Sequence, residues 1–418
     1  MDFVKKNLLS IIALVIGLAG LIGGWIVSSG MTKSQIDDVR QDAVSAANSI
    51  NSLQVDYELP ALRPGEEPWT LSRVTPNSRL TQLVGEQLAA LVAQSEEVRQ
   101  AAINHNSDGK TVLVEGLFPK PQNEEAERIS LSARMVERWP AAHDELLERS
   151  NAGGPIDAQQ MTASLTMQRQ RKVEEILGSR ANQELSPFEQ QEITNDLAKA
   201  RLSLLKNHAD SLNVFGERDM FVKLNEIPAD GLVTRERYQT LFWDWQHAYW
   251  VHEDILEAVV KANESSNGVS NAPIKRIFSI SLDPAYNTEV TTGSLSQPIG
   301  EDYTQSFTGR VGGNPLFDVR YATVEAIIDL SRLPEIENAI SQANFMTLID
   351  LDYFEINPDQ DLRQGYYYGD QSLVRAQMRI ETVWLRSWIE QYLPPRVRET
   401  MGLPVENETP DDGGDGQF

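Results

Sequence analysis

The chain contains no cysteine, which excludes disulfide bonds, thiolate zinc sites and cysteine nucleophiles. Basic residues are scarce beside acidic ones: 37 Lys and Arg stand against 61 Asp and Glu, a formal net charge of -24 at pH 7. Such a surface repels phosphate backbones, so nucleic acid is not an expected partner. What remains is a chain of 418 residues, 41% of them hydrophobic, which is enough for two or three domains with sizeable cores.

Catalytic motifs of fixed spacing give no prediction of an active site. The sequence has no P-loop, no G-x-S-x-G and no H-E-x-x-H. His247 and His252 lie five apart in a predicted helix, whereas two metal ligands on one helical face need a spacing of three or four. Asp350 and Asp352 share a strand face, where paired carboxylates could bind Ca²⁺ or act as acid and base, but a solvated strand edge is the simpler interpretation. We therefore predict no catalytic residue, no metal site and no cofactor.

An uncharged apolar run near the N-terminus predicts a membrane anchor. Residues 8–27 supply the roughly 20 residues that a helix needs to cross about 30 Å of hydrocarbon. Lys5 and Lys6 precede the run, and Asp37 and Asp38 follow it. The positive-inside rule then places the tail 1–7 in the cytoplasm and the bulk of the chain in the periplasm, anchored in a bacterial inner membrane by one pass. A cleaved signal peptide, with its cleavage site near Val27, is the alternative.

Two features predict that the N-terminal helix pairs with another helix. Gly17, Gly20 and Gly24 are small residues that permit close approach in lipid. After the anchor, apolar residues recur at steps of three and four, which predicts a coiled-coil stalk over residues 33–56. Its seam consists of Ile36, Val39, Ala43, Ala46, Ile50 and Leu53. A short amphipathic helix lying on its own domain would look similar, but continuity with the anchor favours a stalk that forms a homodimer, or a heterodimer with a similar envelope protein.

The middle of the chain reads as a linker and then a helical region. Four prolines punctuate residues 57–76, which predicts an irregular linker. Residues 77–231 are predicted to be mostly helical, with Asn77 as an N-cap and helices over 124–150, 157–180 and 187–208. A strand is expected near 110–118 because Pro119 and Pro121 close an apolar stretch there.

Residues 232–393 predict an α+β domain. A helix is expected over 234–263, and strands over 274–282, 317–328, 345–356 and 374–384, with a helix from Ser331 between the second and third strands and a short strand possible near 304–310. The order αββαββ predicts one antiparallel sheet with both helices on one face, a ferredoxin-like layering with permuted connectivity. The segment 394–418 is predicted to be a disordered acidic tail.

Aromatic clusters offer a candidate partner surface. Trp243 and Trp250 lie off the apolar stripe of the helix 234–263, and would mark such a surface if exposed. Tyr366, Tyr367 and Tyr368 form a second candidate patch, for which a packed loop is an equally good interpretation.

The order of these parts resembles a known architecture. The 8–27 span, the 36–53 seam and the segment from Val324 to Pro334 within a terminal αββαββ domain are similar to the PilO-like inner-membrane proteins of type IV pilus assembly and to the M component of type II secretion. The resemblance covers residues 1–53 and 234–384, and residues 59–231 are an extra region. It implies a scaffold without catalytic residues.

The sequence therefore predicts a membrane-anchored, non-enzymatic scaffold or assembly protein of the bacterial envelope, of a type IV pilus or type II secretion-like machine. It would work by protein–protein interaction, and no small-molecule substrate is expected. The alternatives are a membrane-tethered hydrolase, which a cleft with clustered perturbed carboxylates would favour, and a ligand-sensing ectodomain, which a deep apolar pocket would favour.

Overall fold

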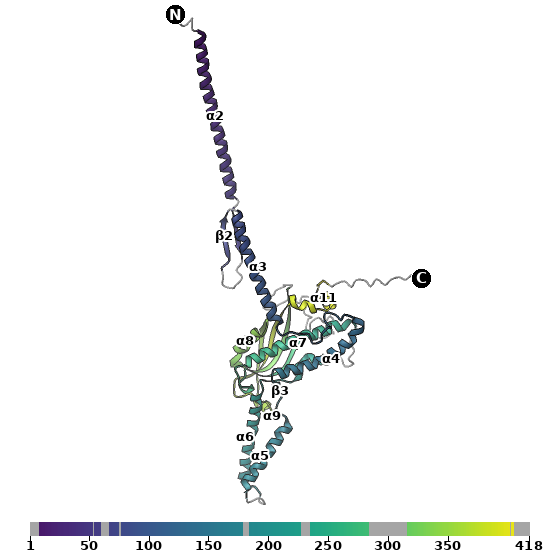
Figure 1. Ribbon diagram of the computed structural model, residues 1–418. Helices are drawn as coiled ribbons and strands as arrows, with labels where there is room; N and C mark the ends of the chain where they lie inside the picture. Colours follow the sequence, from purple (N-terminus) through teal and green to yellow (C-terminus); the bar gives the residue numbers. More distant parts are fainter. Residues whose placement is uncertain are drawn as a thin grey trace, which may run out of the picture. The chain divides into compact units, whose positions relative to one another are not determined.

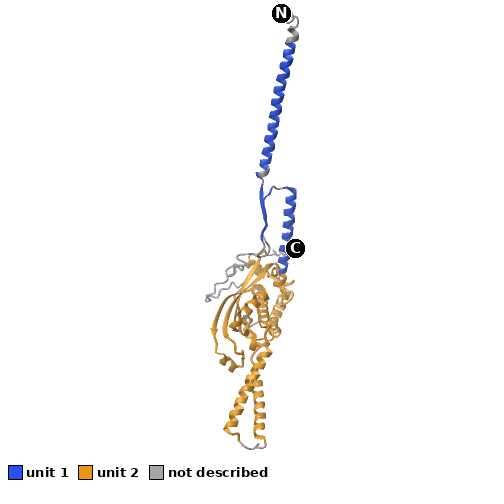
Figure 2. Ribbon diagram, turned by 90° about the vertical axis from the view of Figure 1, so that its left-hand side faces the viewer, with its two compact units in different colours: residues 1–101 blue, residues 102–418 orange. Residues whose placement is uncertain are grey.

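The computed structural model describes residues 8–52, 54–59, 67–74, 77–178, 184–226, 235–283, 316–401 and 403–404. The chain divides into two compact units, Met1–Ala101 and Ala102–Phe418 (Figure 2). It is a mixed helix and sheet protein with one long apolar helix at its N-terminus, as the sequence predicts (Figure 1).

The first unit begins with an unbroken helix of 45 residues, α2 (Leu8–Ser52). It contains both the predicted anchor and most of the predicted stalk, and it is long and apolar enough to cross a membrane. No proline interrupts this helix, so the seam follows the apolar run without a kink. Nearly all of its described side chains are exposed. Leu53, the last predicted seam residue, lies outside the described residues.

A small hairpin occupies part of the predicted linker. β1 (Val55–Leu59) and β2 (Trp69–Val74) pair antiparallel, so the prediction of an irregular segment over 57–76 is wrong at both ends. All four prolines lie outside the two strands, so their positions mark the ends of the strands but do not reveal that the strands pair. α3 (Ser78–Ser107) then starts at Asn77, whose side chain accepts a hydrogen bond from the amide of Leu80 at 2.9 Å, the N-cap interaction that the sequence predicts.

The second unit is built on a six-stranded sheet with the order β3-β4-β5-β6-β8-β7. Its four long strands pair antiparallel, and the two short ones, which the sequence did not reveal, add to one edge in parallel. The strands are β3 (Ala152–Gly153), β4 (Val214–Phe215), β5 (Ile274–Leu282), β6 (Phe317–Asp329), β7 (Met346–Glu355) and β8 (Leu373–Leu385).

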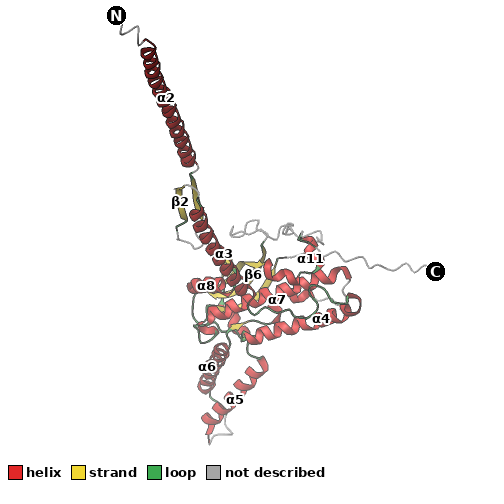
Figure 3. Cartoon of the chain, turned by 45° about the horizontal axis from the view of Figure 1, so that its top comes forward, coloured by secondary structure: helices red, strands yellow, loops and turns green. Residues whose placement is uncertain are grey.

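Helices cover one face of this sheet and extend beyond it (Figure 3). The α-helices of the unit are α4 (Glu124–Arg149), α5 (Ala158–Leu177), α6 (Pro187–Ser211), α7 (Arg235–Asn263), α8 (Leu333–Ala343), α9 (Pro358–Gln364), α10 (Arg386–Ile389) and α11 (Pro395–Thr400). The short 3₁₀ helices are η2 (Arg218–Met220), η3 (Val222–Glu226), η4 (Val269–Asn271), η5 (Leu330–Arg332) and η6 (Glu390–Tyr392).

The main core lies around α7, which is buried on more than one side. Between β5, β6 and β8 on one side and α4 on another, α7 has no wet face over residues 241–252, where every residue but Leu241 is buried. A sequence stripe reveals only one of these contacts, because α4 comes from a separate part of the chain. The helix α7 therefore packs as a central element rather than as an amphipathic cover.

Two local predictions are wrong. Residues 110–118 form turns and loop rather than a strand, because side chains of α7 take their backbone hydrogen bonds: the amide of Leu113 donates to Gln246 Oε1 at 2.6 Å, and Thr111 O accepts from Trp250 Nε1 at 2.9 Å. The predicted tail starts with α11, whose Val397 is buried in the core. After α11, Met401 and Leu403 are partly buried against the same core. The possible strand near 304–310 and residues 405–418 of the tail lie outside the described residues.

Candidate functional site

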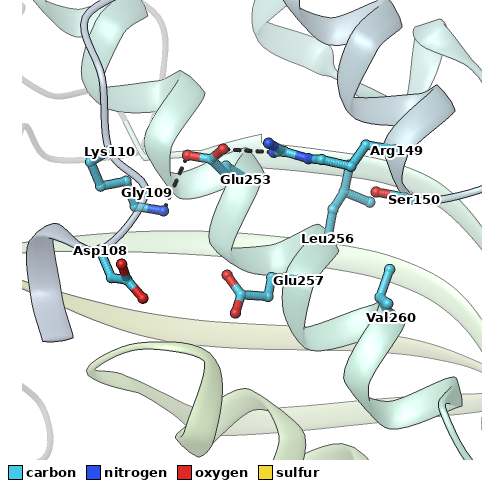
Figure 4. A pocket seen from close by; sticks show the side chains of 9 residues that line it. All are labelled: Asp108, Gly109, Lys110, Arg149, Ser150, Glu253, Leu256, Glu257 and Val260. Atoms are coloured by element: carbon cyan, nitrogen blue, oxygen red, sulfur yellow. Dashed lines mark hydrogen bonds and ion pairs between the residues drawn. The ribbon is translucent and has the colours of Figure 1, made fainter.

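A polar pocket of about 340 Å³ lies where the loop after α3 meets α4 and α7 (Figure 4). Five of its nine lining residues are charged. Lys110 and Arg149 reach opposite oxygens of Glu253, at 3.2 and 2.6 Å, and Lys110 also pairs with Asp254 behind it. Glu257 and Asp108 also line the pocket, and neither carboxylate makes a hydrogen bond or ion pair within the described residues.

Burial controls the protonation behaviour of this group. Desolvation raises the pKa of Asp254 to about 6, although Lys110 and Asn344 both stabilise its ionised form. Burial alone would lower the pKa of Lys110, but Asp254 and Glu253 raise it above its ordinary value. Lys110 is therefore a charged lysine with only 3% of its side chain exposed. It is a structural cation and not a general base.

The same cluster continues into the core through two asparagines. Asn344 Nδ2 donates to Asp254 at 2.8 Å, and Asn106 Nδ2 donates to Asn344 Oδ1 at 2.9 Å. Asn106 Oδ1 accepts from the amide of Leu385 and from Trp388 Nε1, each at 2.8 Å. All four hydrogen bonds are buried or nearly so, and they fix the last turn of α3 to the end of β8. The side chains of Asn106 and Asn344, behind the pocket, thus already make hydrogen bonds that hold the fold together.

The sequence contains two Ser-x-x-Lys pairs, the spacing used by a class of serine hydrolases. In the first, Ser107 Oγ donates to Ile103 O at 2.8 Å, and its lysine, Lys110, is held by carboxylates. In the second, Ser203 and Lys206 are both exposed on α6, and neither side chain makes a hydrogen bond within the described residues. Neither pair is assembled as a nucleophile with a neutral base.

A second polar cluster joins α4 and α7 through two buried histidines. His143 Nδ1 lies 2.8 Å from Trp139 O, and a carbonyl can only accept, so this nitrogen carries hydrogen. His143 Nε2 then accepts from His252 Nδ1 at 2.9 Å. Burial lowers the pKa of His143 to about 4 and that of His252 well below 6.5. Both rings are neutral at pH 7. His247, five residues from His252, is also buried, and the two do not converge on a common site.

Ion pairs are also buried beneath the helices. Asp244 on α7 lies between Lys223 at 2.6 Å and Arg320 at 3.0 Å, which ties η3 and β6 to α7. Asp318 pairs with Arg386 at 2.7 Å, and burial raises the pKa of Asp318 to about 6. Sequence reasoning missed these pairs because their members lie 21 or more positions apart and carry no motif.

The predicted aromatic partner surface is not exposed. Trp243 and Trp250 are both fully buried, so they belong to the core and cannot mark a partner surface in this structure. Tyr366 and Tyr368 are also buried, and they pack against Phe215, while Tyr367 is partly exposed. The packed-loop interpretation of the three tyrosines therefore describes this segment. Trp250 packs against Trp384 and Trp388, and Trp243 packs against Phe118, so contacts with distant segments bury both rings.

The other predicted residues remain at the surface. Asp350 and Asp352 are exposed on β7. Gly17, Gly20 and Gly24 lie on α2, and a Cβ added at any of them would meet nothing within 4 Å. Among the seam residues, Ile36 and Val39 have exposed fractions of 59% and 68%.

Within the described residues, no group of three or more His, Asp or Glu side chains could hold a metal ion. The chain matches no family model, no curated protein and no solved structure.

Proposed function

We propose that this chain is a membrane-anchored, non-enzymatic scaffold or assembly protein of the bacterial envelope, with its larger unit in the periplasm. The observation that carries the proposal is α2, which joins a membrane-length apolar segment to an exposed heptad seam in one unbroken helix. Such a helix ties a folded domain to a membrane and offers an outer segment for pairing.

A finer assignment to a PilO-like protein with a ferredoxin-like terminal domain is supported by the strand order. The two αββ units are α7-β5-β6 and α8-β7-β8. Their second strands, β6 and β8, pair at the centre, and their first strands, β5 and β7, lie on either side of that pair. This arrangement is the one expected when two αββ units lie side by side in a single antiparallel layer, joined through their second strands, with both helices on one face.

The enzymatic and sensor alternatives have less support from the geometry of the pocket. Its perturbed carboxyl, Asp254, is 1% exposed and already bonded to Lys110 and Asn344, so no substrate can reach it without local opening. Five of its nine lining residues are charged, whereas small-molecule pockets usually carry only a few polar groups.

Co-purification from native membranes tests the proposal. The full chain, carrying an affinity tag, is crosslinked in membranes and purified beside a form that lacks residues 102–418. We expect the truncated form to stay in the membrane and to lose defined envelope proteins that the full chain retains. A full chain that recovers no envelope protein would contradict the scaffold function.

The matched controls are Glu257→Gln and Asp350→Asn, which change exposed carboxylates without altering the core. We expect both variants to recover the same envelope proteins as the parent chain and to support normal assembly of the envelope complex. Loss of function from Glu257→Gln, with partners still bound and the fold intact, would instead identify the pocket as a chemical site.

A further inference from the structure

The outer part of α2 has no packing partner among the described residues of the first unit. From residue 30 to residue 49 every residue is exposed, including Ile36 and Val39. A lone helix in water depends on packing of an apolar face, because helix propensity alone gives marginal stability. A helix of another chain, packed along this face, would supply that stabilisation.

A heptad frame fixes which residues face that partner. With Ile36 at position a and Val39 at d, Ala43 and Ala46 take the next a and d positions. Stepping back by sevens along the same unbroken helix continues the frame into the apolar segment. The a and d positions there are Val15, Leu18, Ile22 and Trp25, all large and exposed.

The small residues fall on the opposite side of this frame. Gly17 and Gly24 take position c and Gly20 takes position f, which face away from an a/d seam. Even in a straight helix, at about 100° per residue, the glycine face points roughly 85° away from the outer part of the seam, Ile36 to Ala46. One partner helix cannot cover both faces at once.

The crossing angle gives the same result by a separate route. Helices that meet through G-x-x-x-G cross at about 40°, in the right-handed sense. Val39 lies some 28 Å along α2 from the centre of the glycine face, at about 1.5 Å per residue. Two straight copies crossing there would have axes roughly 20 Å apart at Val39, against the 8–10 Å of packed helices. Two helices that cross at the glycines therefore hold their outer a/d seams too far apart to pack against each other.

We propose that a second copy of this chain docks in parallel along the a/d face of α2, from Val15 to Ala46, and that the three glycines face away from the dimer. The charges beside the seam select this occupant. Lys33 and Arg40 take position e and Asp42 takes position g. In a parallel pair, a g residue faces the e residue five positions further along the other helix, so Asp42 faces Ala47 and Gln35 faces Arg40. No like charges then meet, whereas an antiparallel pair would set the basic e residues against each other. Ala43 and Ala46 let identical helices approach closely.

This inference rests on the proposed membrane anchoring, since two anchors in one bilayer keep the helices parallel and raise their effective concentration. Its test uses cysteine crosslinking of the full chain in native membranes, where the absence of natural cysteine gives a clean background. The experiment compares two pairs of single variants, and within each pair the cysteine lies either on the a/d face of α2 or on the opposite face. Val39→Cys is compared with Gln41→Cys outside the apolar segment, and Leu18→Cys with Gly20→Cys within it.

We expect Val39→Cys and Leu18→Cys to give a homodimer band several-fold stronger than Gln41→Cys and Gly20→Cys. A stronger band from Gly20→Cys than from Leu18→Cys would overturn the proposal in favour of a glycine crossing. Crosslinking of Val39→Cys only to a different protein would reject the second copy as occupant, yet leave the scaffold function standing. No band from any variant would reject the dimer, while the co-purification experiment would still decide the proposed function separately.

Discussion

Acid should destabilise the larger unit, because three of its histidines are buried as neutral rings. His143, His247 and His252 all have a pKa below the ordinary value, chiefly because burial penalises the charged ring. In the unfolded chain they titrate near their ordinary value of 6.5. Below that pH the unfolded state binds more protons than the folded state. The stabilisation is therefore complete above about pH 6.5 and is lost as the pH falls toward 4.

The magnitude follows from these pKa differences. A histidine whose pKa drops from 6.5 to about 4 on folding loses about 2 kcal/mol of stabilisation between pH 7 and pH 5. His247 and His252, whose pKa is also lowered by burial, add to this loss in the same direction. Asp254 and Asp318, whose pKa is raised to about 6, each raise the free energy of unfolding by about 1.3 kcal/mol over the same pH range and so offset part of the histidine loss. The loss from His143 alone is a substantial part of the 5–15 kcal/mol typical of a folded protein.

The perturbation that isolates this effect is His252→Phe. It removes one titrating ring and keeps an aromatic side chain beside Phe221 and Trp139. At pH 7 the variant is expected to lose about 1–3 kcal/mol, because His143 Nε2 is left without its donor. The histidine-linked loss of stability between pH 7 and pH 5 should nevertheless shrink, since one proton-linked group is gone.

Urea denaturation of the full chain in nonionic detergent, followed by the fluorescence of the buried tryptophans, measures both quantities. His105→Gln, which replaces an exposed ring, is the control and should keep the whole pH dependence of the parent chain. An acid-induced loss of stability that is larger in His252→Phe than in the parent would refute the reasoning. So would an unchanged pH dependence in His252→Phe, because the pair would then not be the source of the linkage.

Three further substitutions test the polar core and one turn. Asn106→Ala removes four buried hydrogen bonds and should lower the free energy of unfolding by about 3 kcal/mol or more, measured by urea denaturation. Lys110→Met leaves Asp254 buried without its cation and should cost about 3–5 kcal/mol, whereas Lys110→Met combined with Asp254→Asn should recover part of that loss. Gly268→Ala, at φ 141° with Asp210 backbone 2.5 Å from the new Cβ, should lower the melting temperature far more than Gly109→Ala, which meets nothing within 4 Å. A similar drop for both glycines would contradict the steric reason.

Secondary structure in this chain could be read from sequence where one local pattern dominates. The expected helices over 124–150 and 187–208 correspond to α4 and α6 because caps and proline mark their starts: Ser186 caps α6 with a full capping box, and Asn123 caps α4. The strand expected over 374–384 corresponds to β8, whose apolar residues alternate with Arg375 and Gln377. Even there the wet face ends before the strand does, since Glu381, on the same face as Arg375 and Gln377, is buried.

The sequence could not predict what depends on contacts between distant segments. Trp250 is buried because it also packs against Trp388 and donates to Thr111 O, more than 130 positions away in both directions. The loop at 110–118 resembles a strand in composition, yet its hydrogen bonds go to α7. The pocket forms from three segments whose charges carry no shared motif. Local patterns therefore predict elements, while the candidate site comes from tertiary packing alone.

The sheet topology also limits how the larger unit could bind another protein. β8 is the most regular strand, but it lies between β6 and β7, so its backbone groups are already paired. The two edge strands of the sheet are β3, with two residues, and β7, where a bulge follows Leu348 and exposed Asp350 and Asp352 interrupt the edge. Short, bulged and charged edges are the devices by which proteins prevent pairing with another strand. Partner contacts of the larger unit should therefore be made by side chains, and strand addition to this sheet is disfavoured at both edges.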